Sequence, residues 1–519
     1  MVAFNSRGSL HLLYRKIARC LPGIGVFLFF FILAISNCSR KDRDTEEIVA
    51  IVGDRVITTD EFVRRAEYTI RPPYCRKNSD IEKRIILNSL IAEKLLAFEV
   101  GEDNPLANSP AFQAYIRGRK EQVMRHYLFA EQIKGKVTPD SDTFQKTYDL
   151  AGRNYHLAYY TGTYSDFQRI DTRTDSFDVI YRKLGGLGEI PERNVSWKSK
   201  ENPAIHKALF SEPLSVGQII GPIRVDTDQC LMLKVLGWTD KPAVTGSSVQ
   251  QRSQEVNDAL AREKSEAIWD AYVLKVMKNK RLDFVRDTFE KMVDLMRPMY
   301  ITSRSRKDNA SALNLIEQGE IPSVPVDSIL AQIENNTGFS DQAFFTFDGK
   351  TWTVMDFMRA HASHPLVFRK RKISNGEFPE QFKFAVADLM RDQILNQEAY
   401  KKKIDELPVI REQTDMWGDA LMAKYMKHAR LESQAVTMKS GKEYIEQGEY
   451  IVELLTAYAD SLFKKYSPEI QINLPIFEAI KLTCVDMVVL NDHVPYPETV
   501  PSFPLITTKS RLDYGRRLE

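Results

Sequence analysis

A long internal repeat constrains this 519-residue chain more than any other feature. The stretch LIAEKLLAFE (90–99) returns as LMRDQILNQE (389–398), 299 positions later, with its apolar and acidic positions nearly in step. Upstream of it, AIVGDRVITTDEF (50–62) corresponds to FTFDGKTWTVMDF (345–357). Self-similarity at such a spacing indicates two copies of one structural unit, and a chain this long is expected to divide its apolar residues among several cores.

Each copy begins with the pattern of a strand, a tight turn, a second strand and the start of a helix. Thr58 and Thr353 stand at equivalent positions before the helix, where a threonine hydroxyl can cap the first backbone N–H groups. The following helix carries a wide apolar stripe that must pack on another element or on a bound client. In the first copy the stripe comprises Ile85, Ile86, Leu90, Ile91 and Leu95.

The ends of the two copies also match, but at a shorter spacing. RLDFVRDTFEKM (281–292) corresponds to EIQINLPIFEAI (469–480), 188 positions later, so the first copy holds about 110 additional residues. We expect the first strands of each unit to pair with the last strand of the same unit. Chance similarity between amphipathic helices is the competing interpretation, and the agreement of several segments in the same order argues against it.

The additional residues differ in composition and in predicted secondary structure from the segments around them, which predicts a small separate domain. RNYHLAYYTGTY (153–164) has the aromatic and β-branched residues of a strand. Helical spacing follows at 175–186 and 202–210, and 219–238 reads as strand, turn and strand. The predicted order is β-α-α-β-β, an α+β domain.

This segment resembles a parvulin-type peptidyl-prolyl isomerase domain. His156 lies in YHLAYY, at the position of the family's histidine in its opening strand, and VSWKSKENPAIHKALFSEPLSVGQIIGPI (195–223) resembles the stretch that follows. The residues that fall on the family pattern are Trp197, Ala208, Phe210, Leu214, Gly217 and Pro222. The resemblance implies a catalytic role for His156 and a peptide-binding site formed by His156, Trp197, Phe210 and Leu231.

One departure from the family bears on activity. Active parvulins present a second histidine in the last strand, whereas QCLMLK (229–234) puts Leu231 at that position. Prolyl isomerisation breaks no covalent bond, so a catalyst needs an apolar pocket beside groups that stabilise the twisted amide. His156 and Leu231 cannot form the paired-histidine network, and whether the domain is an enzyme is left open.

The segments around the insert resemble the amino-terminal domain of SurA- and PrsA-type extracytoplasmic foldases, through VGDRVITTDEF (52–62) and ILNSLIAEKLL (86–96). The resemblance implies a mainly α protein with α+β parts, in which two helical cradle units surround one parvulin-like insert. The expected divisions are a signal peptide (1–37), a tether (38–46), the first cradle (47–149), the insert (150–245), the return helix and strand (246–300), a linker (301–343), the second cradle (344–483) and an extended proline-containing tail (484–519).

The amino terminus has the pattern of a secretory signal. Four cations precede the apolar run at 21–36, and ISNCS resembles a bacterial lipobox, which predicts cleavage before Cys38 and lipid attachment to it. An uncleaved signal anchor and an ordinary cleaved signal are the alternatives. The rest of the chain has a net charge of −2, which gives no electrostatic case for nucleic acid. Cys75, Cys230 and Cys484 are widely spaced, and we expect buried thiols rather than a disulfide framework.

No motif predicts a metal or another cofactor. The HASH segment (361–364) has two histidines at helical spacing but no acidic or cysteine partner nearby, and we interpret it as a helix end. The favoured function is a membrane-anchored periplasmic folding factor that binds unfolded secreted or outer-membrane polypeptides. The alternative is a structural envelope lipoprotein that acts as a scaffold in a complex.

Overall fold

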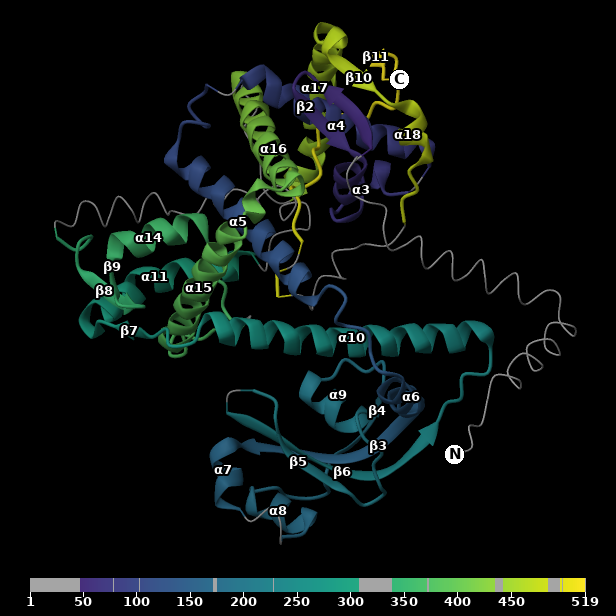
Figure 1. Ribbon diagram of the computed structural model, residues 1–519, viewed down its shortest axis with the longest axis vertical. Helices are drawn as coiled ribbons and strands as arrows, with labels where there is room; N and C mark the ends of the chain where they lie inside the picture. The colour runs from purple at the N-terminus through teal and green to yellow at the C-terminus, as the bar shows by residue number, and fades with distance from the viewer. Residues whose placement is uncertain are drawn as a thin grey trace, which may run out of the picture.

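The computed structural model describes residues 47–518 except 78, 102, 171–174, 227, 308–337, 371–372, 435–441, 484–494 and 497. The expected signal peptide, Cys38, its tether, Cys484 and most of the linker lie outside the described residues. Within them the chain is a mixed α and β protein in which helices predominate and three small sheets are present. It forms two lobes, which share long connecting helices, and an inserted domain below them (Figure 1).

Lobe A combines the start of the first repeat with the end of the second. Its elements are β1 (Ile48–Val52), β2 (Arg55–Thr58), α3 (Thr59–Glu67), α4 (Asp80–Val100), α17 (Lys442–Lys465), β10 (Ile470–Ile472), α18 (Leu474–Ala479) and β11 (Arg516–Arg517). Single turns of 3-10 helix lie at Pro73–Cys75 and Ser467–Glu469. The sheet order is β11-β10-β1-β2.

Lobe B is the reverse combination. Its elements are β7 (Leu282–Phe284), α11 (Arg286–Lys307), β8 (Ala343–Phe347), β9 (Lys350–Thr353), α14 (Val354–Ser363) and α15 (Phe378–Lys401), and the sheet order is β7-β8-β9. The expectation that each unit pairs its own first and last strands is therefore wrong. β1 of the first repeat pairs with β10 of the second, and β8 of the second pairs with β7 of the first.

The two hairpins nevertheless share their local geometry. Each has a register irregularity at the same place, between Ile48 and Ala50 in lobe A and between Ala343 and Phe345 in lobe B. Each is followed by a helix whose N-cap threonine accepts a backbone hydrogen bond three residues on, as the sequence predicted for Thr58 and Thr353. Because these features depend on neighbours in the sequence, they survive the exchange of distant strands.

Two long helices, one from each repeat, cross between the lobes and stand at equivalent sequence positions of their repeats. They are α5 (Pro110–Ile133) and α16 (Pro408–Ser433), with a 3-10 turn at Ile404–Glu406 before α16. In α5, Gly118 permits the approach of α14, since a Cβ there would clash with the backbone carbonyl of Ser363. In α16, by contrast, a Cβ added at Gly418 would meet nothing within 4 Å.

The apolar stripe of α4 is covered within lobe A. Ile85 is 6% exposed, and Ile86, Leu90, Ile91 and Leu95 are fully buried in one core with residues of α16, α17 and the C-terminal tail. The stripe therefore packs on partner elements and is not an open client surface. Cys75 joins this core as a free thiol, and burial raises its pKa to about 12.

The C-terminal tail runs along lobe A, largely without regular structure, as its prolines predicted. Asn88 Nδ2 donates to the carbonyls of Lys509 and Arg511 at 2.7 and 3.0 Å. Phe503 and Ile506 are 2% and 3% exposed, and β11 at the end of the tail pairs in parallel with β10. The tail is thus part of the core of its own lobe.

The insert is reached through α6 (Ser141–Leu150) and left through the long helix α10 (Gly246–Val276), which lies between it and the lobes (Figure 1). Its elements are β3 (Arg153–Thr163), α7 (Tyr164–Arg169), α8 (Phe177–Lys183), β4 (Glu192–Ser196), α9 (Pro203–Phe210), β5 (Ile219–Arg224) and β6 (Gln229–Asp240), with sheet order β4-β3-β6-β5. The α+β class is as predicted, but the predicted order missed α7 and β4. β4 has one fully buried residue, Val195, so its apolar signal is weak.

Candidate functional site

The insert brings together three of the four residues predicted to bind peptide. Trp197, Phe210 and Leu231 belong to one apolar cluster, and the rings of Trp197 and Phe210 are 5.3 Å apart. Phe210 and Leu231 are 2% and 4% exposed, so the cluster is mainly the core of this domain. His206, which was not among the predicted residues, packs edge-on against Trp197, with ring centroids 4.4 Å apart, and at a tilt against Phe210, with centroids 4.8 Å apart. Burial lowers its pKa, and its four-residue spacing from Phe210 on α9 was the signal available.

His156 does not join this cluster. Its neighbour Tyr155 is fully buried in the cluster, and successive side chains of a strand point to opposite faces, so His156 lies on the other face of β3. Its side chain is 47% exposed and its Nε2 is 2.9 Å from a carboxylate oxygen of Glu192 on β4. Leu231 is registered with Thr161, far along β3 from His156. The polar and apolar parts of the predicted peptide site are therefore separated by the sheet.

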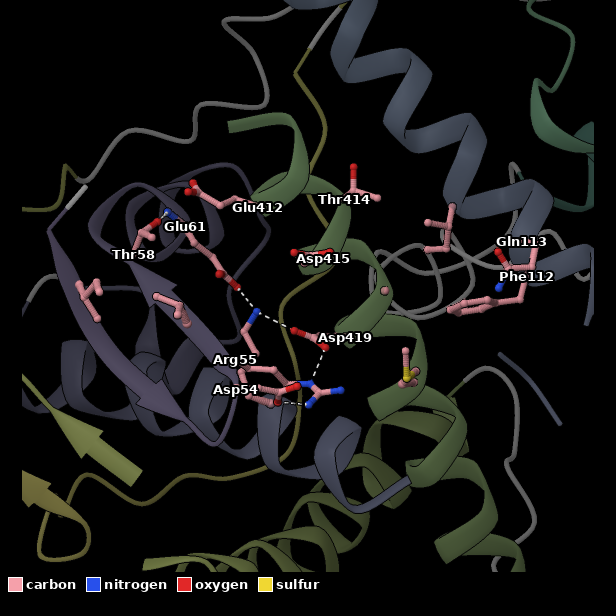
Figure 2. Close-up of a pocket in the computed structure, with 16 residues that line it drawn as sticks. Asp54, Arg55, Thr58, Glu61, Phe112, Gln113, Glu412, Thr414, Asp415 and Asp419 are labelled. Carbon is pink, nitrogen blue, oxygen red and sulfur yellow. Dashed lines mark hydrogen bonds and ion pairs between the residues drawn. The ribbon is translucent and has the colours of Figure 1, made fainter. Parts of the chain in front are cut away.

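A larger hollow lies in lobe A, and we call it cleft A. It has a volume of about 610 Å³ between the β1–β2 hairpin, α3, α4, the start of α5 and α16. Ionisable side chains line one side and apolar side chains line the other. Figure 2 shows Asp415 and Asp419 on α16, opposite Glu61 and Arg55, with Phe112 and Gln113 of α5 beyond them.

A buried lysine organises the charged side of cleft A. Lys94 is 2% exposed, and its Nζ is 3.0 Å from Glu61 and 3.0 Å from Asp419. Arg55 Nε donates to the other oxygen of Asp419 at 2.8 Å, and the same guanidinium pairs with Asp54 at 2.6 Å. Although burial disfavours the ammonium, the two carboxylates raise the pKa of Lys94, so it stays charged. The network therefore joins α3, α4 and α16 across the cleft floor.

The acids of cleft A outnumber its cations. Asp54, Glu61, Glu412, Asp415 and Asp419 line the cleft, whereas Arg55 and Lys94 are its only cations among the described residues. Burial and the neighbouring charge of Asp419 raise the pKa of Asp415, and burial raises that of Glu61. The nearby cations, Lys94 and Arg65 for Glu61 and Lys94, Arg55 and Arg411 for Asp415, offset these shifts only in part.

The opposite side of cleft A is apolar. Phe112 and Ile116 of α5 and Met422 of α16 line it, and Val56 of the β1–β2 hairpin, which is 37% exposed, adds an apolar side chain on the hairpin side. Gly418 lies between the two sides, and because an added Cβ meets nothing, packing does not require glycine there. A glycine inside a helix costs about 1 kcal/mol relative to alanine. The space beside Gly418 can therefore accept a side chain.

The size and lining of cleft A are those of a hollow that can hold a ligand. A hollow of 300–1,000 Å³ with apolar walls and a few placed charges is typical of ligand sites. None of the described residues form a cluster of histidines, cysteines and acids that could hold a metal ion. His361 and His364 of the HASH segment lie at the end of α14 as predicted, where His361 hydrogen-bonds Tyr300 at 2.6 Å. The expectation that no acid lies nearby is wrong, because Asp392 of α15 is 2.9 Å from His364.

Comparison with protein-family models, curated proteins and solved structures finds no match to this chain. The site therefore has to be interpreted from its own geometry. In the part of the chain that the structure describes, no helix combines the length and the apolar character needed to cross a membrane.

Proposed function

We propose that this chain is an extracytoplasmic folding factor that binds extended polypeptide segments, and that cleft A is a binding site for them. The observation that carries the proposal is a hollow that combines an apolar wall with a group of acids that outnumber its cations. Burial of apolar side chains against Phe112, Ile116 and Met422 contributes about 25 cal/mol per Å² without sequence-specific contacts. The acids favour segments that also carry lysine or arginine.

We further propose that the insert is a parvulin-like domain with little or no isomerase activity. The four-stranded sheet and the aromatic cluster support the resemblance, while the exposed position of His156 and the buried position of Leu231 argue against a working site. Robust isomerisation of a prolyl peptide that His156→Ala abolishes would make the chain an enzyme and overturn this part of the proposal.

The proposed location is the periplasmic side of a bacterial envelope, with the body tethered through a lipid on Cys38. This part rests on the sequence alone, on the basic head, the apolar run and ISNCS. Acyl chains would hold the lobes at a membrane surface, where secreted polypeptides emerge unfolded.

A structural scaffold is the second candidate, and one observation favours it. The stripe of α4 is buried, and the tail closes lobe A along α4. A scaffold would present closed lobes to one stoichiometric partner, whereas a folding factor would bind many unfolded chains weakly.

Gly418 offers a test that changes no charge. In Gly418→Phe the new side chain enters the cleft, and we expect suppression of client aggregation to fall several-fold. Gly418→Ala is the matched control, because a single methyl leaves most of the volume empty and improves helix propensity. We expect it to retain activity and to melt at the same or a higher temperature.

If Gly418→Phe and Gly418→Ala suppress aggregation equally well, cleft A is not a client-binding site. If the unaltered chain suppresses no aggregation and extracts from envelopes with a single stoichiometric partner, the scaffold is the better description.

A further inference from the structure

Lobe B has a second hollow at the position that corresponds to cleft A. This hollow, cleft B, has a volume of about 260 Å³ and lies between β9, α14, α15 and α5. Because the repeats exchange their ends, α5 of the first repeat faces the hairpin of the second, just as α16 of the second faces the hairpin of the first. The repeat has thus produced two equivalent clefts.

Five residues that line cleft B stand at repeat positions equivalent to residues that line cleft A. Arg55, Glu61 and Lys94 of cleft A correspond to Lys350, Asp356 and Gln393 of cleft B. On the crossing helices, Asp419 corresponds to Glu121.

The remaining correspondence reverses a charge. Asp415 of α16 lines cleft A, and Arg117 lines cleft B from the equivalent position of α5, 298 residues earlier. Gln393 carries no charge where cleft A has the buried Lys94. Cleft B also has Arg359, on the first helix after the hairpin.

The acids of cleft B have neighbours of their own. Burial raises the pKa of Glu121, and the charges of Arg125 and Arg117 partly offset this rise. Glu121 accepts hydrogen bonds from Asn396 Nδ2 at 2.8 Å and from the Tyr400 hydroxyl at 3.4 Å. Asp356 accepts the backbone N–H of Thr353 at 3.1 Å as part of the capping box of α14.

The cations of cleft B are exposed. Arg117, Lys350 and Arg359 approach the hollow from three different elements, and none of them forms an ion pair with a described residue. The indole of Trp352, 5.1 Å from the ammonium of Lys350, provides an apolar surface beside them.

We propose that cleft B binds acidic polypeptide segments, so that the duplicated clefts A and B select segments of opposite charge. That the ligand is a polypeptide segment rests on the proposed function. That it is acidic rests on the charge reversal between Asp415 and Arg117. Three exposed cations around one hollow attract a carboxylate-bearing chain, and Trp352 takes an apolar side chain next to it. One client with mixed charge would then engage both lobes, and the linkage would raise its overall affinity.

The test uses the full chain and two fluorescent peptides of equal length with the same apolar residues, one rich in glutamate and one rich in lysine. Arg117→Asp removes an attraction and introduces a repulsion at cleft B. Because exposed ion pairs are individually weak, we expect the glutamate peptide to bind roughly threefold to tenfold more weakly, and the lysine peptide to be unaffected. Asp415→Arg is the mirror variant and should weaken the lysine peptide only.

Salt provides a second measurement, since screening should weaken both interactions as ionic strength rises. If Arg117→Asp leaves glutamate-peptide binding unchanged, or weakens both peptides equally, cleft B is not an acidic-segment site. If only the lysine peptide binds, and its affinity depends on Asp415, this inference is overturned while the proposed function still holds. Failure of both peptides together with failure to suppress aggregation would overturn the proposed function itself.

Discussion

Replacement of Lys94 tests the network on which cleft A depends. Lys94→Gln introduces the residue that lobe B has at the equivalent position, Gln393, and removes a buried ammonium that lies 3.0 Å from each of two carboxylates. Breaking a buried ion pair costs about 3–5 kcal/mol, because the remaining charge is left uncompensated. Asp419 keeps its pair with Arg55 at 2.8 Å, so the lower end, about 3 kcal/mol, is expected.

The assay is urea unfolding followed by far-UV circular dichroism at several pH values. Burial already raises the pKa of Glu61, and loss of Lys94 raises it further. A carboxyl whose pKa is higher in the folded state than in the unfolded state destabilises the fold when ionised, and this cost disappears as the pH falls through the folded-state pKa. The variant should therefore recover stability relative to the unaltered chain as the pH falls through the raised folded-state pKa of Glu61.

Lys465→Gln is the matched control in the same lobe. Its side chain is 56% exposed and pairs with Glu99 at 2.9 Å, so its removal should cost far less stability than the removal of the buried Lys94. If Lys94→Gln costs no more than this control and shows no recovery at low pH, Lys94 does not tie the cleft floor together.

Three further predictions concern other parts of the chain. Burial lowers the pKa of His361 to about 4, so the folded state favours the neutral imidazole. The contribution of His361 to stability is complete above pH 6.5 and is lost as the pH falls, and the free energy of unfolding should drop by up to about 3 kcal/mol. His361→Gln should flatten this pH dependence when it is measured by urea unfolding. Replacing residues 150–245 by a short flexible linker should leave a helical protein that melts cooperatively, since Lys198–Glu255 and Lys207–Glu263 between the insert and α10 are exposed ion pairs; a large loss of helix in circular dichroism would show that the boundary is misplaced. Metabolic labelling with a fatty acid should mark the chain and not Cys38→Ala, and equal labelling would exclude Cys38 as the lipid site.

Much of the fold was predictable because it depends on neighbouring residues. The hairpin turns, the threonine caps at Thr58 and Thr353 and the long helices follow from local hydrogen bonds and hydrophobic periodicity. The insert was recognisable as an α+β domain because its strand-like segments contrast with the helical pattern on either side. Strand β4 was missed because a five-residue strand with one fully buried side chain carries almost no periodic signal.

The candidate site was less accessible to sequence reasoning. His156 drew attention through a family resemblance, yet the alternation of β3 places it on the face opposite Trp197 and Phe210. The acids at 415 and 419, four residues apart on one helix around a glycine, were visible but had no assigned partner. Lys94 gave no signal, because a lysine in an amphipathic helix is ordinarily a solvated residue.

By itself, then, the sequence determined the local elements and the existence of a repeat, since both are written in short-range patterns that recur 295 to 299 positions apart. Only the tertiary structure decided which copies associate. β7 and β10 are both three-residue strands, and either could complete either hairpin by pattern alone. Packing over each lobe resolves that choice in favour of exchange. The same exchange brings Arg55, Lys94 and Asp419 together across more than 300 positions, which is why the clefts appear only in three dimensions.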